Sequence, residues 1–186
     1  MNKYTLAVLL VLLGLAPFIR CFAAATLPGR VETPVQRPEW WLSQPTQGGY
    51  VCSYGIGVGN TQQLSQAAAR ENATEDACDF VALYANQLSE TFQRESGLMD
   101  PRVQTVMEKM VKAISCAKYS DAAEGQIETK IMTDKGKVRY RTWIQVLIPK
   151  SAIEQNLVNN IRNEENLSQL FMQSASYRSI LEKVQD

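Results

Sequence analysis

The sequence of 186 residues contains no histidine. This absence excludes Ser-His-Asp and Cys-His catalysis, imidazole metal ligands and histidine pH switches. The 19 basic and 19 acidic residues balance, so the chain lacks the concentrated positive charge that nucleic-acid-binding proteins use. No nucleophile–base pair can be assigned either. We therefore predict a protein that is not an enzyme, has no metal, cofactor or catalytic residue, and binds no nucleic acid.

Long apolar runs are also missing. The main one, residues 4–18, is shorter than the roughly 20 residues of a membrane-spanning helix. It follows Lys3 and precedes three alanines that end at Ala25, an order typical of a secretory signal. We predict a signal peptide over residues 1–25, cleavage between Ala25 and Thr26, and no transmembrane span after cleavage. An uncleaved membrane anchor is the alternative.

Small residues are absent before Cys21, where a bacterial lipoprotein signal needs them. The preceding residues, Phe18 to Arg20, are bulky or charged, and we expect no direct lipid anchor. An exported chain without such an anchor belongs in the periplasm, an oxidising compartment in which disulfides persist.

Three cysteines follow the signal: Cys52, Cys78 and Cys116. None has the C-x-x-C spacing of a zinc or redox motif. Given the rise per residue of strands and helices, Cys52 and Cys78 would lie at similar heights if a helix folded back on its strand. This favours a Cys52–Cys78 bridge, with Cys78–Cys116 as the alternative. Buried cysteines without any bridge are a further interpretation.

Residues 26–46 hold four of the seven prolines. Proline fixes φ and removes a donor, so we predict an extended lead-in here. Trp40 and Trp41 fall within it. They either pin this segment against the domain or form a surface for a partner.

A strand over residues 50–58 alternates glycine with apolar residues, which places the glycines on one face and predicts close approach by another backbone. A helix follows, with Asn60 and Gln63 at capping-box spacing, and it extends to about Leu88. Small alanines let it lie close to the sheet. Its predicted packing face consists of Ala69, Ala73, Ala77, Phe80 and Tyr84.

A second helix is expected after Asp100, an N-cap followed by proline. Its apolar stripe is predicted core and consists of Val103, Val106, Met107, Met110, Val111 and Ile114. A hairpin follows, with strands over residues 126–133 and 138–148 joined by a turn at 134–137. Arg139, Arg141 and Trp143 share one face of the returning strand, which is either solvated or contacts a partner.

The chain ends in helical patterns. Ser151 and Glu154 form a second capping box, and helical spacing resumes after a polar interruption at residues 162–166. The terminal piece, which includes Phe171, packs either on its own sheet or on a neighbour. The order β-α-α-β-β-α predicts an α+β fold in which helices pack on a small antiparallel sheet. We assign residues 47–155 to this domain and residues 156–186 to a C-terminal helical extension.

The glycines at 55, 57 and 59 do not form a dinucleotide fingerprint, because the third glycine would have to stand at position 60, which is Asn. They contribute instead to a resemblance that covers roughly residues 38–155. The chain resembles the Lpp-twenty lipoprotein family and the N-terminal module of flagellar assembly protein T. The shared features are Pro38-x-Trp40, the glycine strand, the alanine repeat and the late hairpin from Ala123 to Pro149.

This resemblance implies an exported, envelope-located α+β domain without catalysis, built into ring-shaped assemblies under the outer membrane. We therefore expect a structural subunit that forms a homo-oligomer or docks on a flagellar or secretion-system ring. Without a lipobox, outer-membrane association would run through partner proteins. The expected partner contacts are Trp40, Trp41, Arg139, Arg141, Trp143 and Phe171. The alternative is a small binding module for a cell-wall fragment or peptide, using the glycine face and the hairpin side chains.

Overall fold

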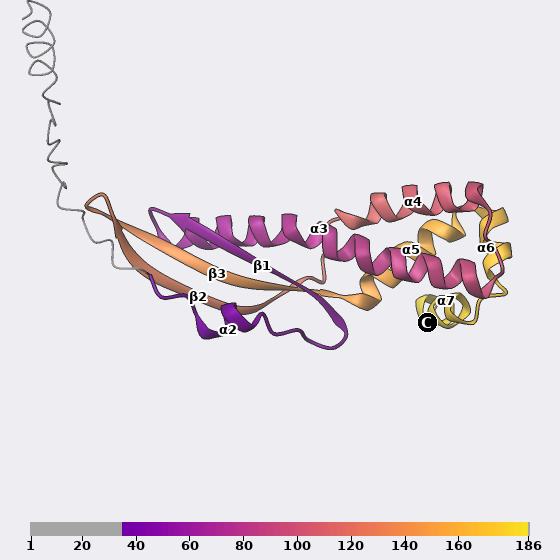
Figure 1. The fold of residues 1–186 in the computed structure, drawn as a ribbon, viewed down its shortest axis with the longest axis horizontal. Helices are drawn as coiled ribbons and strands as arrows, with labels where there is room; N and C mark the ends of the chain where they lie inside the picture. Colours follow the sequence, from indigo (N-terminus) through magenta and orange to yellow (C-terminus); the bar gives the residue numbers. More distant parts are fainter. Residues whose placement is uncertain (1–34, 186) are drawn as a thin grey trace, which may run out of the picture. The chain divides into compact units, whose positions relative to one another are not determined.

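The computed structural model describes residues 35–185, which fold as the predicted α+β unit (Figure 1). Its elements are α2 (Glu39–Ser43), β1 (Tyr50–Gly59), α3 (Gln62–Glu95), α4 (Pro101–Ser115), β2 (Ala123–Asp134), β3 (Lys137–Pro149), α5 (Lys150–Arg162), α6 (Glu165–Phe171) and α7 (Ala175–Gln185). The strands form one antiparallel sheet in the order β1-β3-β2. The predicted signal peptide and its cleavage site at Ala25 and Thr26 lie outside the described residues.

The β2–β3 hairpin is closed by the predicted turn. Asp134 pairs with Lys137, and the two residues between them, Lys135 and Gly136, have φ of 48° and 80°. Positive φ at both central positions is the requirement of a type I′ turn, whose twist matches that of the flanking strands. This turn sets the register of the hairpin from Asp134 to Ile127, and a bulge between Ile127 and Glu124 then shifts the pairing by one residue.

Backbone contact between β1 and α3 confirms the prediction from the glycines and alanines. A Cβ atom added at Gly55 would lie 2.5 Å from the Ala73 nitrogen and 2.8 Å from the Ala73 Cβ. Ala69 and Ala73 are fully buried. Because glycine faces alanine, the first half of α3 rests directly on the strand, and Figure 1 shows it along one face of the sheet.

The second half of α3 packs against helices instead of strands. It contacts α4, α5 and α7, and the predicted stripe of α4 buries Met107, Met110, Val111 and Ile114. Val106, also in that prediction, remains 37% exposed. Phe92 lies at the centre of an aromatic cluster with Phe171 and Tyr177, at ring-centroid distances of 6.1 Å and 5.6 Å. The terminal helices therefore pack on their own helical core, and neither of the two predicted alternatives for them, the sheet or a neighbour, describes this packing.

Several predicted details of the helices are wrong. Thr61, not Asn60, caps α3, since its Oγ1 accepts from the Leu64 nitrogen at 3.2 Å. The buried face of α3 recurs every four residues through Val81 and Ala85, so Phe80 lies beside that face and is 48% exposed. The helix continues past Leu88 to Glu95 because the C-terminal helices cover its end. Ser151 does not cap α5, which begins at Lys150 directly after Pro149.

The predicted domain boundaries also differ from the structure. Residues 35–46 pack on the sheet and include the short helix α2, so they are part of the folded unit and not an extended lead-in. The boundary between residues 155 and 156 falls inside α5. Within residues 35–185, no helix combines the length and apolar character that a membrane span requires.

Candidate protein-interaction surface

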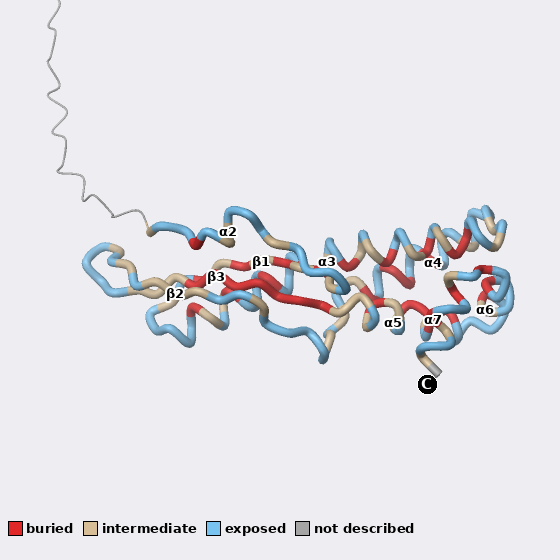
Figure 2. Tube along the Cα trace, turned by 90° about the horizontal axis from the view of Figure 1, so that it is seen from below, coloured by how far each residue is buried: buried red, intermediate tan, exposed pale blue. Residues whose placement is uncertain are grey.

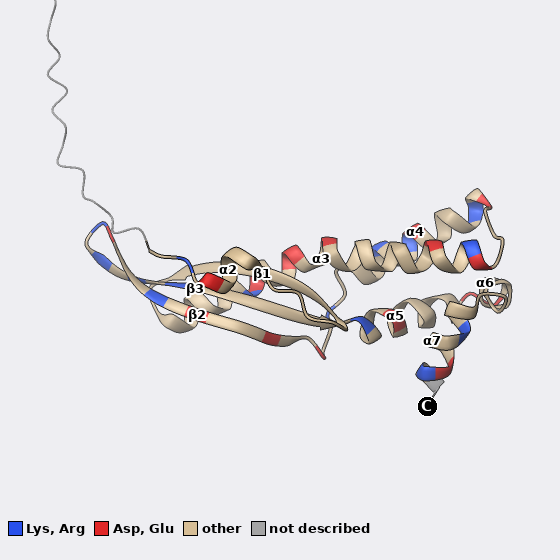
Figure 3. Ribbon diagram, turned by 60° about the horizontal axis from the view of Figure 1, so that its bottom comes forward, with Lys and Arg blue, Asp and Glu red and all other residues tan. Residues whose placement is uncertain are grey.

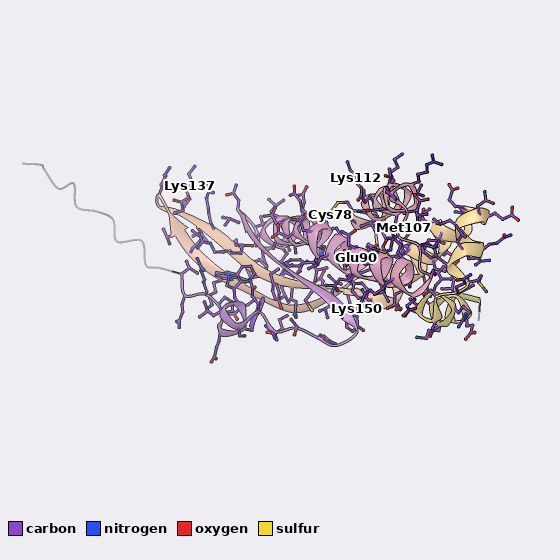
Figure 4. The ribbon with its side chains drawn as sticks, turned by 45° about the vertical axis from the view of Figure 1, so that its right-hand side comes forward. Cys78, Glu90, Met107, Lys112, Lys137 and Lys150 are labelled. Carbon is purple, nitrogen blue, oxygen red and sulfur yellow. A yellow bond between two sulfur atoms is a disulfide. The ribbon has the colours of Figure 1, made fainter. Side chains whose placement is uncertain are left out.

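A disulfide joins Cys78 of α3 to Cys116 at the end of α4, with 4.7 Å between the Cα atoms (Figure 4). The predicted Cys52–Cys78 bridge is wrong, and the alternative pairing is the one present. The reason lies in the strand: Val51, Ser53 and Gly55 point toward α3 and are buried, which turns Cys52 to the opposite face of the sheet.

That opposite face is covered by residues 35–47, which we call the strap; its helix α2 lies across the sheet from α3 in Figure 1. Gln145 donates from Nε2 to the Pro45 carbonyl at 2.7 Å, and the Tyr54 hydroxyl donates to the same oxygen at 2.5 Å. Lys130 Nζ donates to the Gln36 carbonyl at 2.8 Å. Burial under the strap raises the pKa of Tyr54. These bonds attach the strap to all three strands.

Trp40 and Trp41 are both half-buried. The Trp41 ring meets Tyr54 edge-on at 6.1 Å, and Trp40 meets Trp41 at 6.0 Å. Their rings therefore pin the strap to the sheet, as one of the two interpretations predicted. The large apolar side chain that the strap exposes is Leu42, 72% accessible.

Two of the expected partner contacts are core residues. Trp143 is 1% exposed and Phe171 is 0% exposed, so the prediction that they contact a partner is wrong. Trp143 is buried because both faces of β3 are covered, as the continuous buried stretch in Figure 2 shows. Arg139 and Arg141 remain half-buried, and Arg139 pairs with Asp134 at 3.4 Å.

The glycine face of β1 offers no ligand site. The backbone of α3 occupies the space beside Gly55, Gly57 and Gly59, and the face that carries Trp143 lies under the strap. The predicted ligand site on the glycine face and the hairpin side chains is therefore wrong. The same packing leaves no room for a phosphate group at the glycines.

A cleft of about 410 Å³ lies between α3 and α4. Its lining is polar at the α3 side, where Gln93 donates to the Ser89 hydroxyl at 3.1 Å, and both residues are buried. Glu90 on α3 and Met107 on α4, labelled in Figure 4, belong to the two walls. The volume falls within the range of small-molecule sites.

A second hollow of about 290 Å³ lies beside β1, on the side of α3 that carries Phe80 and Leu83. These two side chains are 48% and 59% exposed. Tyr84 forms part of the wall, and its hydroxyl donates to Glu154 at 2.5 Å. Burial and this carboxylate together raise the Tyr84 pKa, so the phenol stays protonated.

Among residues 35–185, the carboxyl group with the most strongly shifted pKa is that of Glu95, which caps a helix. Glu95 accepts hydrogen bonds from the Ser174 hydroxyl at 2.6 Å and from the Ser176 nitrogen and hydroxyl at 2.9 and 2.7 Å. These bonds lower its pKa to about 2. They connect the end of α3 to the first turn of α7.

The surface left open is the outer strand of the hairpin. Two apolar side chains of β2 are exposed, Ile127 by 43% and Ile131 by 68%, and Val138 of the neighbouring strand β3 is 58% exposed. They lie on the α3 face of the sheet, because the register pairs Ile127 with Ile144 and Thr133 with Val138. The helix packs mainly on β1 and β3, and the ion pair that it forms with β2, between Arg70 and Glu124, lies at the far end of that strand from the turn. We call Ile127 and Ile131 the β2 patch.

A row of hydroxyl groups marks where the cover of α3 ends. Ser65 on α3 bonds to Thr142 on β3 at 2.7 Å, and Thr142 bonds to Thr129 on β2 at 2.8 Å. Within residues 35–185, no further strand pairs with β2 on the side away from β3, so β2 forms a free edge of the sheet. Figure 3 shows charged residues of both signs along the hairpin, and Lys130 Nζ lies 3.0 Å from Glu128 Oε1.

The part of the chain that the structure describes contains no group of three or more cysteine or acidic side chains placed to hold a metal ion. In the comparisons, no protein-family model, curated protein or solved structure matches the chain. The geometry of its surfaces therefore carries the functional argument.

Proposed function

We propose that this chain is a non-catalytic structural subunit, exported to the periplasm, that assembles into a bacterial cell-envelope complex such as a flagellar or secretion-system outer-membrane ring. The observation that carries the proposal is the β2 patch beside an unpaired sheet edge. Exposed apolar side chains along an open strand favour association with another protein chain.

Other features support this proposal. The Cys78–Cys116 bridge suits an oxidising compartment, as export requires. The predicted signal peptide over residues 1–25 and the resemblance to envelope domains both support a periplasmic location. The covered glycine face and the capping role of Glu95 leave those groups without a catalytic task.

Fractionation of cells that produce the full chain tests this function. We expect the processed chain in the envelope fraction, and cross-linking of intact cells should capture it in species of defined, higher mass. A chain that remains in the cytosol, or that cross-links to nothing in the envelope, would contradict the proposed role. A Gly48→Ala chain carried through the same fractionation is a suitable control for the effect of a substitution as such, since nothing lies within 4 Å of an added Cβ there.

A second candidate function is supported by the cleft between α3 and α4. Its volume of about 410 Å³ and its mixed lining of amides, carboxylates and methionines suit a small polar ligand such as a soluble peptidoglycan fragment. Such fragments should then raise the unfolding temperature of the chain, and Glu90→Gln should abolish the rise. No rise for the unsubstituted chain would eliminate this candidate.

A further inference from the structure

The free edge of β2 has its backbone groups directed away from the sheet at alternate residues. A two-residue turn closes on a hydrogen-bonded pair, here Asp134 and Lys137, and such pairs alternate with non-bonded pairs along an antiparallel ladder. The register pairs Thr129 with Thr142 at an odd step from the turn. Thr129, and with it Ile127 and Ile131, therefore directs its N–H and C=O groups outward.

We propose that a second copy of this chain pairs with β2 along this edge, antiparallel and centred on Thr129. The two-fold axis then places Thr129 opposite its own copy and Ile127 opposite Ile131 of the other chain. All of these residues have outward-directed backbone groups, so the two edges can form hydrogen bonds without change to either sheet. A single two-fold axis also closes this contact between two chains, so the β2 edge adds no third copy. The inference rests on the proposed function and names the partner.

Charge complementarity is the reason to name a second copy of this chain as the partner. In this register Glu128 of each chain stands opposite Lys130 of the other, so four charges alternate in sign on the strap side of the joined sheet. A shift by two residues in one direction would place Glu128 opposite itself, and a shift in the other direction would place Lys130 opposite itself. Like charges directly opposite each other destabilise a strand pair, so one register is favoured.

Apolar complementarity acts on the other face. The isoleucines are 43% and 68% exposed in the single chain, and the proposed register brings those of both chains into one row beside the Thr129 hydroxyls. Val138 lies on the same face but on β3, one strand farther from the partner. It therefore stays outside the contact and provides a matched control.

Ile131→Lys tests the apolar contact in the exported chain. Light scattering over a concentration series should show a dimer for the unsubstituted chain, and Ile131→Lys should raise its dissociation constant by at least about tenfold. Val138→Lys, the same change at a comparably exposed site, should leave the constant unchanged. Circular dichroism spectra that match among the three chains establish that folding is intact.

Charge exchange tests the register. Lys130→Glu and Glu128→Lys should each weaken self-association by about tenfold, because each creates two like-charged pairs. A mixture of the two variants should associate as strongly as the unsubstituted chain, since an acidic edge then faces a basic one. A mixture no tighter than the separate variants would overturn the register.

The outcomes separate this inference from the proposed function. A chain that is monomeric at every concentration, or a dimer that is insensitive to Ile131→Lys, would overturn the β2 contact. A dimer weakened equally by Ile131→Lys and Val138→Lys would overturn it as well. The proposed function fails by a different result, namely absence of the chain from the envelope or from cross-linked envelope complexes.

Discussion

Gly55→Ala should disrupt the contact between β1 and α3. The added methyl group would lie 2.5 Å from the Ala73 nitrogen and 2.8 Å from the Ala73 Cβ, and closer still to the Ala69 carbonyl oxygen. Ordinary van der Waals contact begins near 3.4 Å, so helix and strand must separate by at least about 1 Å. Neither backbone can avoid the methyl group by a change of rotamer.

The cost of this substitution follows from the packing. A gap of 0.5–1 Å forfeits about a quarter to a half of the dispersion energy of the atoms that line it, and Ala69, Ala73 and Ala77 are all within this tightly packed interface. We expect a loss of about 3 kcal/mol in the free energy of unfolding, at the upper end of the usual cost of overpacking. For a domain of this size, that loss lowers Tm by about 6–12 °C.

Urea denaturation followed by circular dichroism measures this loss. Gly48→Ala is the matched control, because nothing lies within 4 Å of its added Cβ, and it should change the free energy of unfolding by less than about 0.5 kcal/mol. If Gly55→Ala were as stable as this control, α3 would not rest on the glycines, and the packing argument would be refuted.

Three further predictions concern the disulfide, the Glu95 cap and the strap. Cys116→Ser opens a bridge between residues 38 apart and should destabilise the chain by about 4 kcal/mol by loop entropy; a urea midpoint unchanged from that of the unsubstituted chain would contradict this. The hydrogen bonds that lower the Glu95 pKa from 4.5 to about 2 add stability that is complete above pH 4.5 and is lost as pH falls toward 2. Glu95→Gln should therefore be less stable at neutral pH and should flatten the acid limb of a stability–pH curve. An unchanged limb would be evidence against the cap. Trp41→Ala should cost about 1–2 kcal/mol and speed proteolysis of the strap, whereas Leu42→Ala, at a 72% exposed site, should do neither.

Local chemistry predicted much of the fold. The turn at Lys135 and Gly136, the N-cap at Asp100 and the stripe of α4 depend on neighbours within a few residues. The structure confirms the turn, the cap and the stripe, apart from the exposed Val106. The contact of glycine with alanine was also predictable, because a missing side chain on a strand and a small one on a helix meet only if the two backbones approach.

Long-range contacts were not predictable in this way. The bond from Gln145 to Pro45 joins residues 100 positions apart, and a proline-rich segment has no periodicity to show which face it covers. In the sequence, Trp143 shares a strand face with Arg139 and Arg141, which is typical of a surface residue. In the structure the strap buries it. The error at Cys52 was avoidable, because the glycines already placed the helix on the opposite face of β1.

The position of the glycines also determines which strand remains open. All three lie on β1, and only there can the backbone of α3 approach the sheet closely. The helix therefore packs over β1 and its neighbour β3. A helix on a three-stranded sheet would otherwise pack over the central strand and shield both edges. Here the strand farthest from the glycines, β2, loses that cover, and Ile131 on it is more exposed than any apolar residue of β1 or β3. The features that fix the helix on one edge of the sheet thus leave the other edge available for a second chain.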